Sequence, residues 1–248
     1  MQEKILCRIF DRDRPFIFFD IGACEGLSSV RYSRLFPKST IYAFEPVPRN
    51  YQTVLENKEK YGLEDMEVFQ MALSSQKGSS RLHLSSGRPE HVSKDDMIDY
   101  GNKSSSLLEP ERHLEIYPWL KFEEKIVVST DTLDHFCSEH GVSVIDFIHM
   151  DVQGAELMVL ESGKSTLRNV KSIWLEVGKV ELYRGQPLKR EVESFLEEQG
   201  WIKVISTVGK ISGDQFWVNK AFAKNMNASK RFLLLLYRMK AFLNDLLR

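Results

Sequence analysis

The sequence predicts an α/β domain: a Rossmann-like, seven-stranded, mostly parallel sheet with helices on both faces, an antiparallel last strand and an amphipathic C-terminal helix. Three observations predict this fold class. Short apolar runs alternate along the chain with segments of helical periodicity. The first run, residues 16–20, is apolar up to its final Asp, as in a strand that is buried on both faces. The last two runs, 201–206 and 215–221, fit a closing antiparallel pair.

Periodicity and turn residues place the next elements, as far as residue 71. The helix after the first strand ends before Pro37, since proline cannot continue a helix. Pro46 and Pro48 separate the second strand from the following helix. The predicted elements are a helix over 26–36, a strand over 40–44, a helix over 50–61 and a strand over 66–71.

Residues 74–106 interrupt this order because they are rich in serine and glycine. One short alternating run, residues 81–84, predicts a hairpin arm whose partner covers 126–129. We interpret the region between the arms, about residues 85–125, as an insertion rather than as part of the core.

Regular alternation then resumes, and no linker long enough to divide the chain is present. The predicted elements are a helix over 133–140, a strand over 144–150, a helix over 155–163, a strand over 172–177 and a helix over 189–199. We therefore expect residues 1–222 to form one domain.

Residues 223–248 are expected to form a separate, basic amphipathic helix. Five apolar residues recur there at helical spacing and share one face: Phe232, Leu235, Met239, Phe242 and Leu246. Within residues 229–248, five basic residues, of which the last is Arg248, oppose one acid, Asp245. The helix is expected to dock on the domain or on a second copy of the chain. A membrane-surface helix and a disordered extension are the alternatives.

Composition limits the class of protein. Of 248 residues, 42% are hydrophobic and 28% are charged, and the net charge of −1 gives no overall attraction to nucleic acid. No segment reaches the roughly 20 apolar residues that span a bilayer, and the charged N-terminus does not resemble a signal peptide. Three widely spaced cysteines fit a reducing compartment. We expect a cytoplasmic protein without a nucleic-acid partner, and the tail leaves peripheral membrane association open.

The first candidate site is the loop after the first strand. Asp20 ends the strand, and Gly22 and Gly26 let the backbone turn sharply and approach a ligand. The helix behind them presents free amides. Glu45 ends the next strand, where an acid suits two ribose hydroxyls. The loop therefore predicts a nucleoside-cofactor pocket.

Two cofactor classes use such a pocket. A dinucleotide site requires G-x-G-x-x-G, because the pyrophosphate rests on the helix N-terminus, whereas this loop has only G-x-x-x-G. Glu25 would repel a pyrophosphate, but it would favour the ammonium and sulfonium groups of S-adenosylmethionine. The loop thus favours the methyl donor, and a dinucleotide-dependent enzyme on the same fold is the alternative.

The second candidate site is the end of the strand over 144–150. His149 and Asp151 alternate with Met150, so both are expected to face one side of the sheet edge where ligands of parallel sheets bind. Asp151 leads into a glycine turn and is interpreted as a site residue. His149 by itself is more typical of a satisfied core histidine.

The order of motifs along residues 15–220 resembles the FkbM family of methyltransferases. The motifs are FDIGA at 19–23 with Gly26, YAFEP at 42–46, ALS at 72–74, SSSL at 104–107, TLD at 132–134, IDFI at 145–148, DVQGAE at 151–156, WLEV at 174–177 and DQFWV at 214–218. Each motif alone is weak, but the ordered series is specific.

The resemblance implies a class I methyltransferase fold with S-adenosylmethionine as cofactor. It implies a set of residues around that cofactor: Asp20, Gly22, Ala23, Glu25, Gly26, Glu45, Pro46, Met71, Ala72, Ser106 and Asp151. In this set Glu45 holds the ribose, Met71 and Ala72 lie near the adenine, the 104–106 loop closes over the pocket, and Asp151 lies near the transferred methyl.

The resemblance also implies O-methylation of a hydroxyl on a sugar, a glycan or a secondary metabolite. An alkyl hydroxyl is a weak nucleophile, so a general base is expected, with Asp151 first and His149 and Glu176 behind it. The 85–125 insertion is expected to hold the acceptor. There Trp119 or Tyr117 would stack on a sugar ring and Arg88 or Arg112 would hold a phosphate.

Two further alternatives remain open from the sequence. His83, His91 and His113 lack the spacing of metal ligands, so no metal site is predicted from them, although Asp151 and Glu176 are placed where a carboxylate site is conceivable. A non-catalytic module that binds a membrane or a partner through the C-terminal helix is the second alternative.

Overall fold

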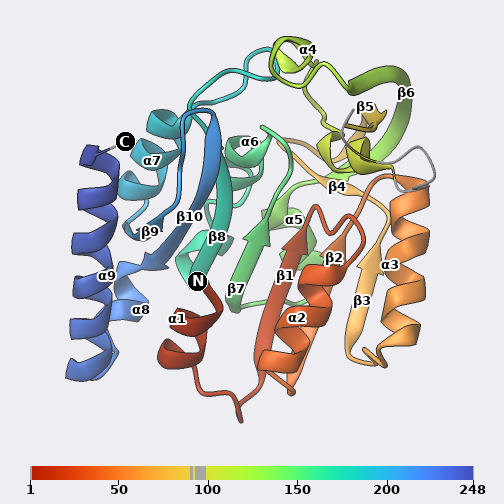
Figure 1. Cartoon of the computed structure of the whole chain (residues 1–248). Coiled ribbons are helices and arrows are strands. Elements are labelled where there is room, and N and C mark those ends of the chain that lie inside the picture. The colour runs from red at the N-terminus through yellow and green to blue at the C-terminus, as the bar shows by residue number, and fades with distance from the viewer. Residues whose placement is uncertain (1, 90–91, 93–98, 248) are drawn as a thin grey trace.

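A seven-stranded sheet organises the chain, whose computed structural model describes residues 2–89, 92 and 99–247 (Figure 1). The strand order is β3-β2-β1-β7-β8-β10-β9, and β10 runs antiparallel to both of its neighbours. The strands are β1 (Phe16–Ile21), β2 (Ser39–Phe44), β3 (Met66–Phe69), β7 (Ile145–Met150), β8 (Val170–Gly178), β9 (Trp201–Ser206) and β10 (Ser212–Asn219). The predicted Rossmann-like sheet with an antiparallel last strand is confirmed.

Helices cover both faces of this sheet, as predicted. One core cluster joins one face of the sheet to α5 (Leu133–Glu139), α6 (Glu156–Glu161) and α7 (Lys189–Glu198). A second cluster joins the other face to α1 (Gln2–Ile9), α2 (Leu27–Leu35), α3 (Pro48–Lys60), α8 (Lys220–Lys224) and α9 (Ala228–Leu247). Five phenylalanines of β1, β2 and β7 are fully buried between these layers. Apolar burial on both faces explains why these strands are continuous hydrophobic runs.

The helix α1 is a structural element that the sequence analysis missed. Its first half is polar, but Ile5, Leu6 and Ile9 are buried in the second core cluster. Three apolar residues in an eight-residue segment are too few for a periodicity that is distinct from chance.

A small second sheet lies over the carboxyl ends of β2 and β3 (Figure 1). It contains β4 (Ala72–Leu73), β6 (Leu120–Asp131) and β5 (Gly78–Gly87), and the predicted pairing of the two hairpin arms is confirmed by the pair Leu82–Ile126. Two boundaries were wrong. The third strand ends at Phe69 because the chain then leaves the main sheet to pair with β6. Both hairpin arms are also longer than predicted, and they extend into the 85–125 region.

In the described residues of the 85–125 region, the structure also has two short helices, η1 (Tyr100–Ser104) and α4 (His113–Ile116). Of the three histidines considered as metal ligands, His113 is buried with Nδ1 3.0 Å from the carbonyl oxygen of Leu182. His83 is buried in β5. His91 lies outside the described residues.

The last strand is shorter than predicted and gives way to a helix. It ends at Asn219 rather than at residue 221, because Asn219 Oδ1 accepts the amide of Ala221 and so caps α8. The predicted C-terminal helix is present as α9 and packs along β9. The side chains of Asp245, Leu246 and Arg248 lie outside the described part. Within the described residues, no helix combines the length and apolar character needed to cross a bilayer.

Asp146 links the amino ends of three neighbouring strands. Its Oδ2 accepts the amide of Ile17 in β1 at 2.8 Å, and its Oδ1 accepts Lys171 Nζ of β8 at 2.6 Å. Asp146 is buried. The carboxylate therefore satisfies an amide at the point where β1 enters the sheet, opposite the carboxyl edge.

Replacement of Asp146 by Ala is expected to lower the free energy of unfolding by about 2 kcal/mol, because the buried amide of Ile17 loses its acceptor. Urea unfolding followed by circular dichroism measures this loss. Lys171→Met is the matched control, since it removes the partly exposed ion pair but keeps the amide acceptor, and it should cost less than about 1 kcal/mol. Equal losses in the two variants would contradict the role of the amide.

Candidate active site

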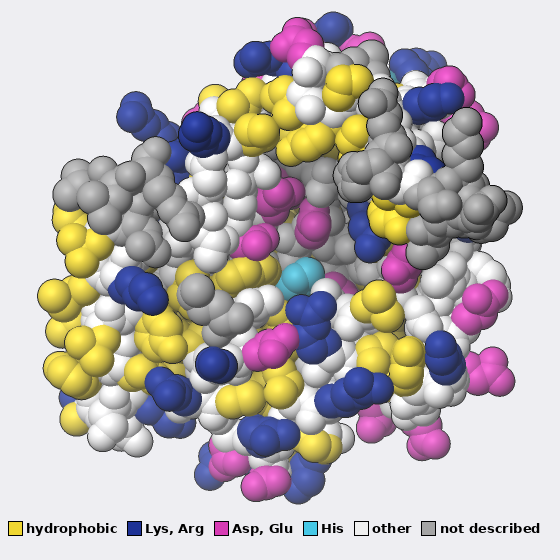
Figure 2. Space-filling model, viewed as in Figure 1, with side chains coloured by type: hydrophobic (Ala, Val, Ile, Leu, Met, Phe, Trp, Pro, Cys, Tyr) yellow, Lys and Arg dark blue, Asp and Glu magenta, His cyan; other side chains and the backbone are white. Residues whose placement is uncertain are grey.

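A pocket that opens to solvent lies at the carboxyl ends of β1, β2 and β7. Figure 2 shows a hollow in this face of the molecule with acidic side chains gathered around it. Six residues of the predicted cofactor set line the pocket: Gly22, Glu45, Pro46, Met71, Ala72 and Asp151. They come from three strands and from the small sheet, so the fold brings together residues that are far apart in the sequence.

Gly22 makes the pocket geometrically possible. Its φ is +82°, and a Cβ at this position would overlap the carbonyl oxygen of Asp151. The amides of Gly22 and Ala23 both donate to the carbonyl oxygen of Phe44 at 3.0 Å. A side chain at position 22 would force the loop after β1 away from the turn after β7.

Two residues other than glycine also adopt left-handed backbone, Cys24 and Gln153, each with φ of +53°. Both line the pocket. Such conformations cost on the order of 1 kcal/mol, and they persist where the surrounding structure enforces them, which is common at ligand sites. Burial, aided by the charges of Glu45 and Glu25, raises the pKa of the Cys24 thiol to about 12. Cys24 is therefore a neutral thiol and not a nucleophile.

Glu45 is the buried acid of the pocket. Its Oε2 accepts the amide of Cys24 at 2.7 Å and its Oε1 accepts the amide of Val47 at 2.9 Å. Burial nevertheless dominates and raises the pKa of Glu45 to about 7. Each carboxylate oxygen keeps acceptor capacity for a further hydrogen bond from a ligand.

The other predicted cofactor residues do not line the pocket. Asp20 is fully buried, with Ser29 Oγ donating to its Oδ2 at 2.6 Å and His149 Nδ1 3.2 Å from its Oδ1. Glu25 lies 3.9 Å from Lys103 Nζ. Ser106 Oγ donates to the carbonyl oxygen of Gln153 at 2.7 Å. Ala23 and Gly26 are also absent from the lining, and Gly26 forms the left-handed start of α2.

The three predicted catalytic residues converge at the ends of β7 and β8. Gln153 Nε2 donates to Asp151 Oδ1 at 2.6 Å and to Glu176 Oε2 at 3.4 Å, so one amide group bridges the two carboxylates. Glu176 Oε1 accepts Ser212 Oγ at 2.8 Å. The convergence of Asp151 and Glu176 that the sequence left open is therefore present, with the Gln153 amide between them.

This cluster of acids shifts the pKa of its members upward. Burial, followed by the charge of Asp151, raises the pKa of Glu176 to about 7. Asp151 faces the cleft, and the surrounding protein raises its pKa as well. Burial disfavours protonation of His149, but the hydrogen bond and the charge of Asp20 outweigh it, so the pKa of His149 is also raised. Among these three groups, Glu176 therefore exchanges its proton near neutral pH.

Several lining or supporting residues escaped the sequence analysis. Tyr183 OH donates to the carbonyl oxygen of Ser104 at 2.7 Å and lies 3.0 Å from Gln153 Oε1. Asn102 and Lys103 line the pocket from η1, and Asn102 Oδ1 is buried without a hydrogen-bond partner. The nearby SSSL motif was the only local signal for this loop, because the pocket forms through contacts between distant segments.

The residues proposed to hold an acceptor lie near the surface of the small sheet. Tyr117 and Trp119 are half-buried with ring centroids 6.4 Å apart. Arg112 pairs with Glu115 at 3.1 Å. The carbonyl of Leu182 accepts the amide of Arg112, which fastens this region to the segment that carries Tyr183. Neither aromatic residue lines the pocket.

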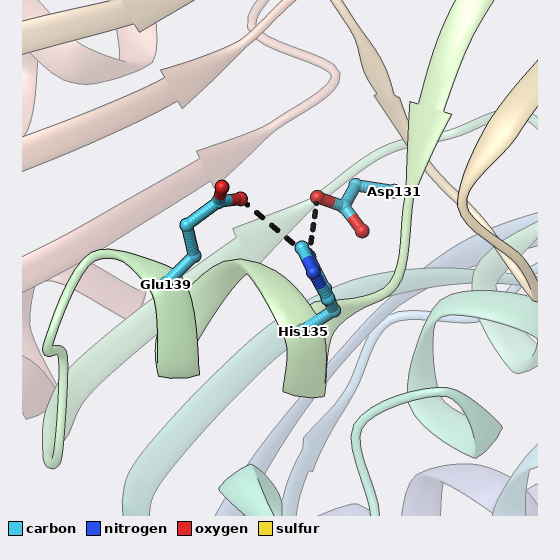
Figure 3. Close-up of side chains that lie close together, drawn as sticks. All are labelled: Asp131, His135 and Glu139. Carbon is cyan, nitrogen blue, oxygen red and sulfur yellow. Dashed lines mark hydrogen bonds and ion pairs between the residues drawn. The ribbon is translucent and has the colours of Figure 1, made fainter.

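A second group of potential ligands lies at the start of α5 (Figure 3). His135 Nδ1 lies 3.0 Å from Asp131 Oδ2 and 3.6 Å from Glu139 Oε2. Lys77 Nζ approaches the same group, 3.2 Å from His135 Nε2 and 3.8 Å from Glu139 Oε2. Asp131 Oδ1 accepts the amide of Thr132. These contacts form a network of hydrogen bonds and ion pairs that connects β6 to α5, and we interpret the group as structural.

Known proteins share both the sequence pattern and the fold. The Methyltransferase FkbM domain matches residues 20–202. 2-O-methyltransferase NoeI of Sinorhizobium fredii is 38% identical over 174 residues, which cover 70% of this chain and 68% of that protein. Methyltransferase sdnD of Sordaria araneosa is 27% identical, over 75% of this chain and 73% of that protein.

A solved structure provides a comparison of the fold. The crystal structure of methyltransferase FkbM from Methylobacillus flagellatus matches with a TM-score of 0.51 and 12% identity, over 84% of this chain and 44% of that chain. The domain match extends from the end of β1 to the start of β9, and it includes the loop after β1, Glu45 and Asp151. The chain therefore belongs to the FkbM family of methyltransferases.

Proposed function

We propose that this methyltransferase uses S-adenosylmethionine to methylate a hydroxyl oxygen of a neutral, hydroxyl-rich acceptor such as a sugar. The observation that carries the proposal is the arrangement of Glu45 and Asp151, two acids that follow β2 and β7, on either side of β1, and line one pocket. Family membership supports methyl transfer. The 2-O-methyltransferase relative supports oxygen as the acceptor atom. A dinucleotide-dependent enzyme, the alternative for this loop, has no support from the family.

The pocket suits the nucleoside part of the methyl donor. Glu45 offers two carboxylate oxygens for ribose hydroxyls, and Gly22 leaves room for a ligand to approach the backbone. Apolar side chains of Phe44, Met71 and Leu82 provide a slot for a flat base. The unpartnered Asn102 Oδ1 matches the amino group that an adenine carries.

The charged end of the donor also finds matching groups. Lys103 Nζ at the rim suits its carboxylate, and the acids Glu25 and Asp151 suit its ammonium and sulfonium. Asp20 is buried outside the pocket lining and contacts His149 through its carboxylate. We therefore propose that Asp20 positions His149. When bound, S-adenosylmethionine supplies an electrophilic methyl group.

Asp151 is the proposed general base. Its carboxylate lines the pocket, is held at Oδ1 by Gln153, and keeps Oδ2 for the proton of an acceptor hydroxyl. Its raised pKa, caused chiefly by burial, improves its strength as a base relative to a free aspartate. Glu176 and His149 do not line the pocket. They act on Asp151 only through their electrostatic interactions with it.

The charge of the cleft bears on the acceptor. Asp151, Glu176 and Asp214 lie together, and burial followed by the charge of Asp151 raises the pKa of Asp214. These acids disfavour a phosphorylated acceptor near the methyl, whereas carboxylates bind sugar hydroxyls well. A neutral sugar hydroxyl is therefore favoured, with Tyr117 or Trp119 as outlying stacking surfaces.

Transfer of a labelled methyl group from S-adenosylmethionine tests the function directly. Neutral oligosaccharides, nucleotide sugars and RNA form the acceptor panel, and label is expected on neutral oligosaccharides, with nuclear magnetic resonance locating it on oxygen. Transfer only to RNA or only to nucleotide sugars would contradict the proposed acceptor, and absence of donor binding by calorimetry would contradict the proposed donor.

Donor binding is expected to strengthen as pH rises from 6 to 8. The raised pKa of about 7 means that Glu45 gains its charge over this interval, and the carboxylate form accepts two ribose hydroxyls better than the acid. The expected gain in affinity is about tenfold. Calorimetry with S-adenosylhomocysteine measures it. Glu45→Gln is the control and should bind weakly with a flatter pH dependence; an equally steep profile would assign the titration to another group.

Asp151→Asn is expected to lower turnover by about 100-fold or more, because the amide cannot accept the hydroxyl proton. Its donor affinity is expected to change by less than about tenfold, since Asn keeps the bond from Gln153. Asp214→Asn removes the same charge from a group that interacts with Asp151 but does not line the pocket, and it serves as the matched control, with a smaller loss of turnover. If both variants lost turnover equally, Asp151 would act only through its charge and not as the general base.

A further inference from the structure

The helix α9 exposes an unusual amount of apolar surface. Eleven large apolar side chains are exposed in the described part of the chain, and six of them belong to this one helix: Phe232, Leu235, Leu236, Met239, Phe242 and Leu243. Phe232 and Phe242 are 61% and 67% exposed. In Figure 2 the hydrophobic side chains follow the edge of the molecule that α9 forms in Figure 1. A patch of this kind marks an interaction surface.

These six side chains share the face of α9 that points away from the domain. Their spacing of three and four places them on one stripe of the helix. The opposite side is the docked side, where Leu234 and Ala241 are buried and Lys230 Nζ donates to the carbonyl oxygen of Ile9. The exposed stripe therefore does not serve the packing of α9 on its own domain.

Positive charge borders the stripe. Residues 220–243 contain six lysines and arginines and no acid. Of these, Arg231, Arg238 and Lys240 are exposed on α9 next to the stripe. Glu197 is one acid near this surface, in the groove that Arg238 shares with Lys203 and Lys220. The surroundings of the apolar stripe are thus predominantly cationic.

We propose that this face of α9 binds an anionic lipid surface. An apolar stripe bordered by lysine and arginine is the pattern of helices that lie in the headgroup region of a bilayer. A second copy of the chain fits less well, because pairing through the stripe would bring the arginines and lysines of both copies together. The helix would lie on the membrane, since no helix among the described residues is long and apolar enough to cross one.

Vesicle co-sedimentation of the full chain tests the proposal. Vesicles of phosphatidylcholine alone are compared with vesicles that also contain phosphatidylserine. Each basic residue near an anionic surface strengthens binding about fivefold, so three exposed ones predict a preference on the order of 100-fold for the anionic vesicles at low salt. No binding, or equal binding to both vesicles, overturns the proposal.

Two variants separate the apolar and the charged contributions. Phe232→Ser combined with Phe242→Ser should abolish binding, and Arg231→Gln combined with Arg238→Gln and Lys240→Gln should abolish the anionic preference. Val127→Ser, at a 74% exposed position on β6, is the matched control and should bind as the parent chain does. Light scattering provides the competing outcome: a dimer that the phenylalanine variant dissociates assigns the face to a second copy and overturns the lipid assignment.

Discussion

The pocket depends on the close contact between the loop after β1 and the ends of the two neighbouring strands. The amide of Asp151 donates to the carbonyl oxygen of Ile21, and the amide of Gly22 donates to that of Phe44, so β2, β1 and β7 are tied together where they end. The absence of a side chain at Gly22 permits this approach. As a result Glu45 and Asp151 lie on either side of the loop after β1. The roles proposed for the two acids depend on this placement.

Burial of acids is the second property that shapes the site. Glu45 and Glu176 each have a pKa of about 7, and burial is the leading cause in both cases. Glu45, which we propose for donor recognition, and Glu176, which lies beside Asp151, therefore titrate in the same pH range. Gln153 controls the geometry of the second group, since its amide holds Asp151 while its own backbone is kept left-handed. Parallel α/β sheets bind ligands at this edge, where the strands deliver side chains from a rigid scaffold.

The fold was largely predictable, because local signals and the long-range arrangement agree. Continuous apolar runs indicated strands buried on both faces, and prolines and glycines indicated where helices begin and end. The errors have local causes. The helix α1 is too short for a clear period, β3 ends early because the chain switches to the small sheet, and the capping side chain of Asn219 ends β10. In each case a contact with another segment, or a single capping bond, outweighed the pattern.

The sequence by itself determined the succession of strands and helices along the chain, the glycine loop, and the two acids that follow β2 and β7, because these depend on periodicity and on residue type at a strand end. Only the tertiary structure decided which residues line the pocket. Asn102 and Lys103 reach it from a distant loop, whereas Asp20 and Ser106 do not line it. It also decided which face of α9 is covered, since periodicity shows an apolar stripe but not which side of the helix meets the sheet. Such outcomes depend on contacts between segments far apart in the chain, and no local pattern encodes them.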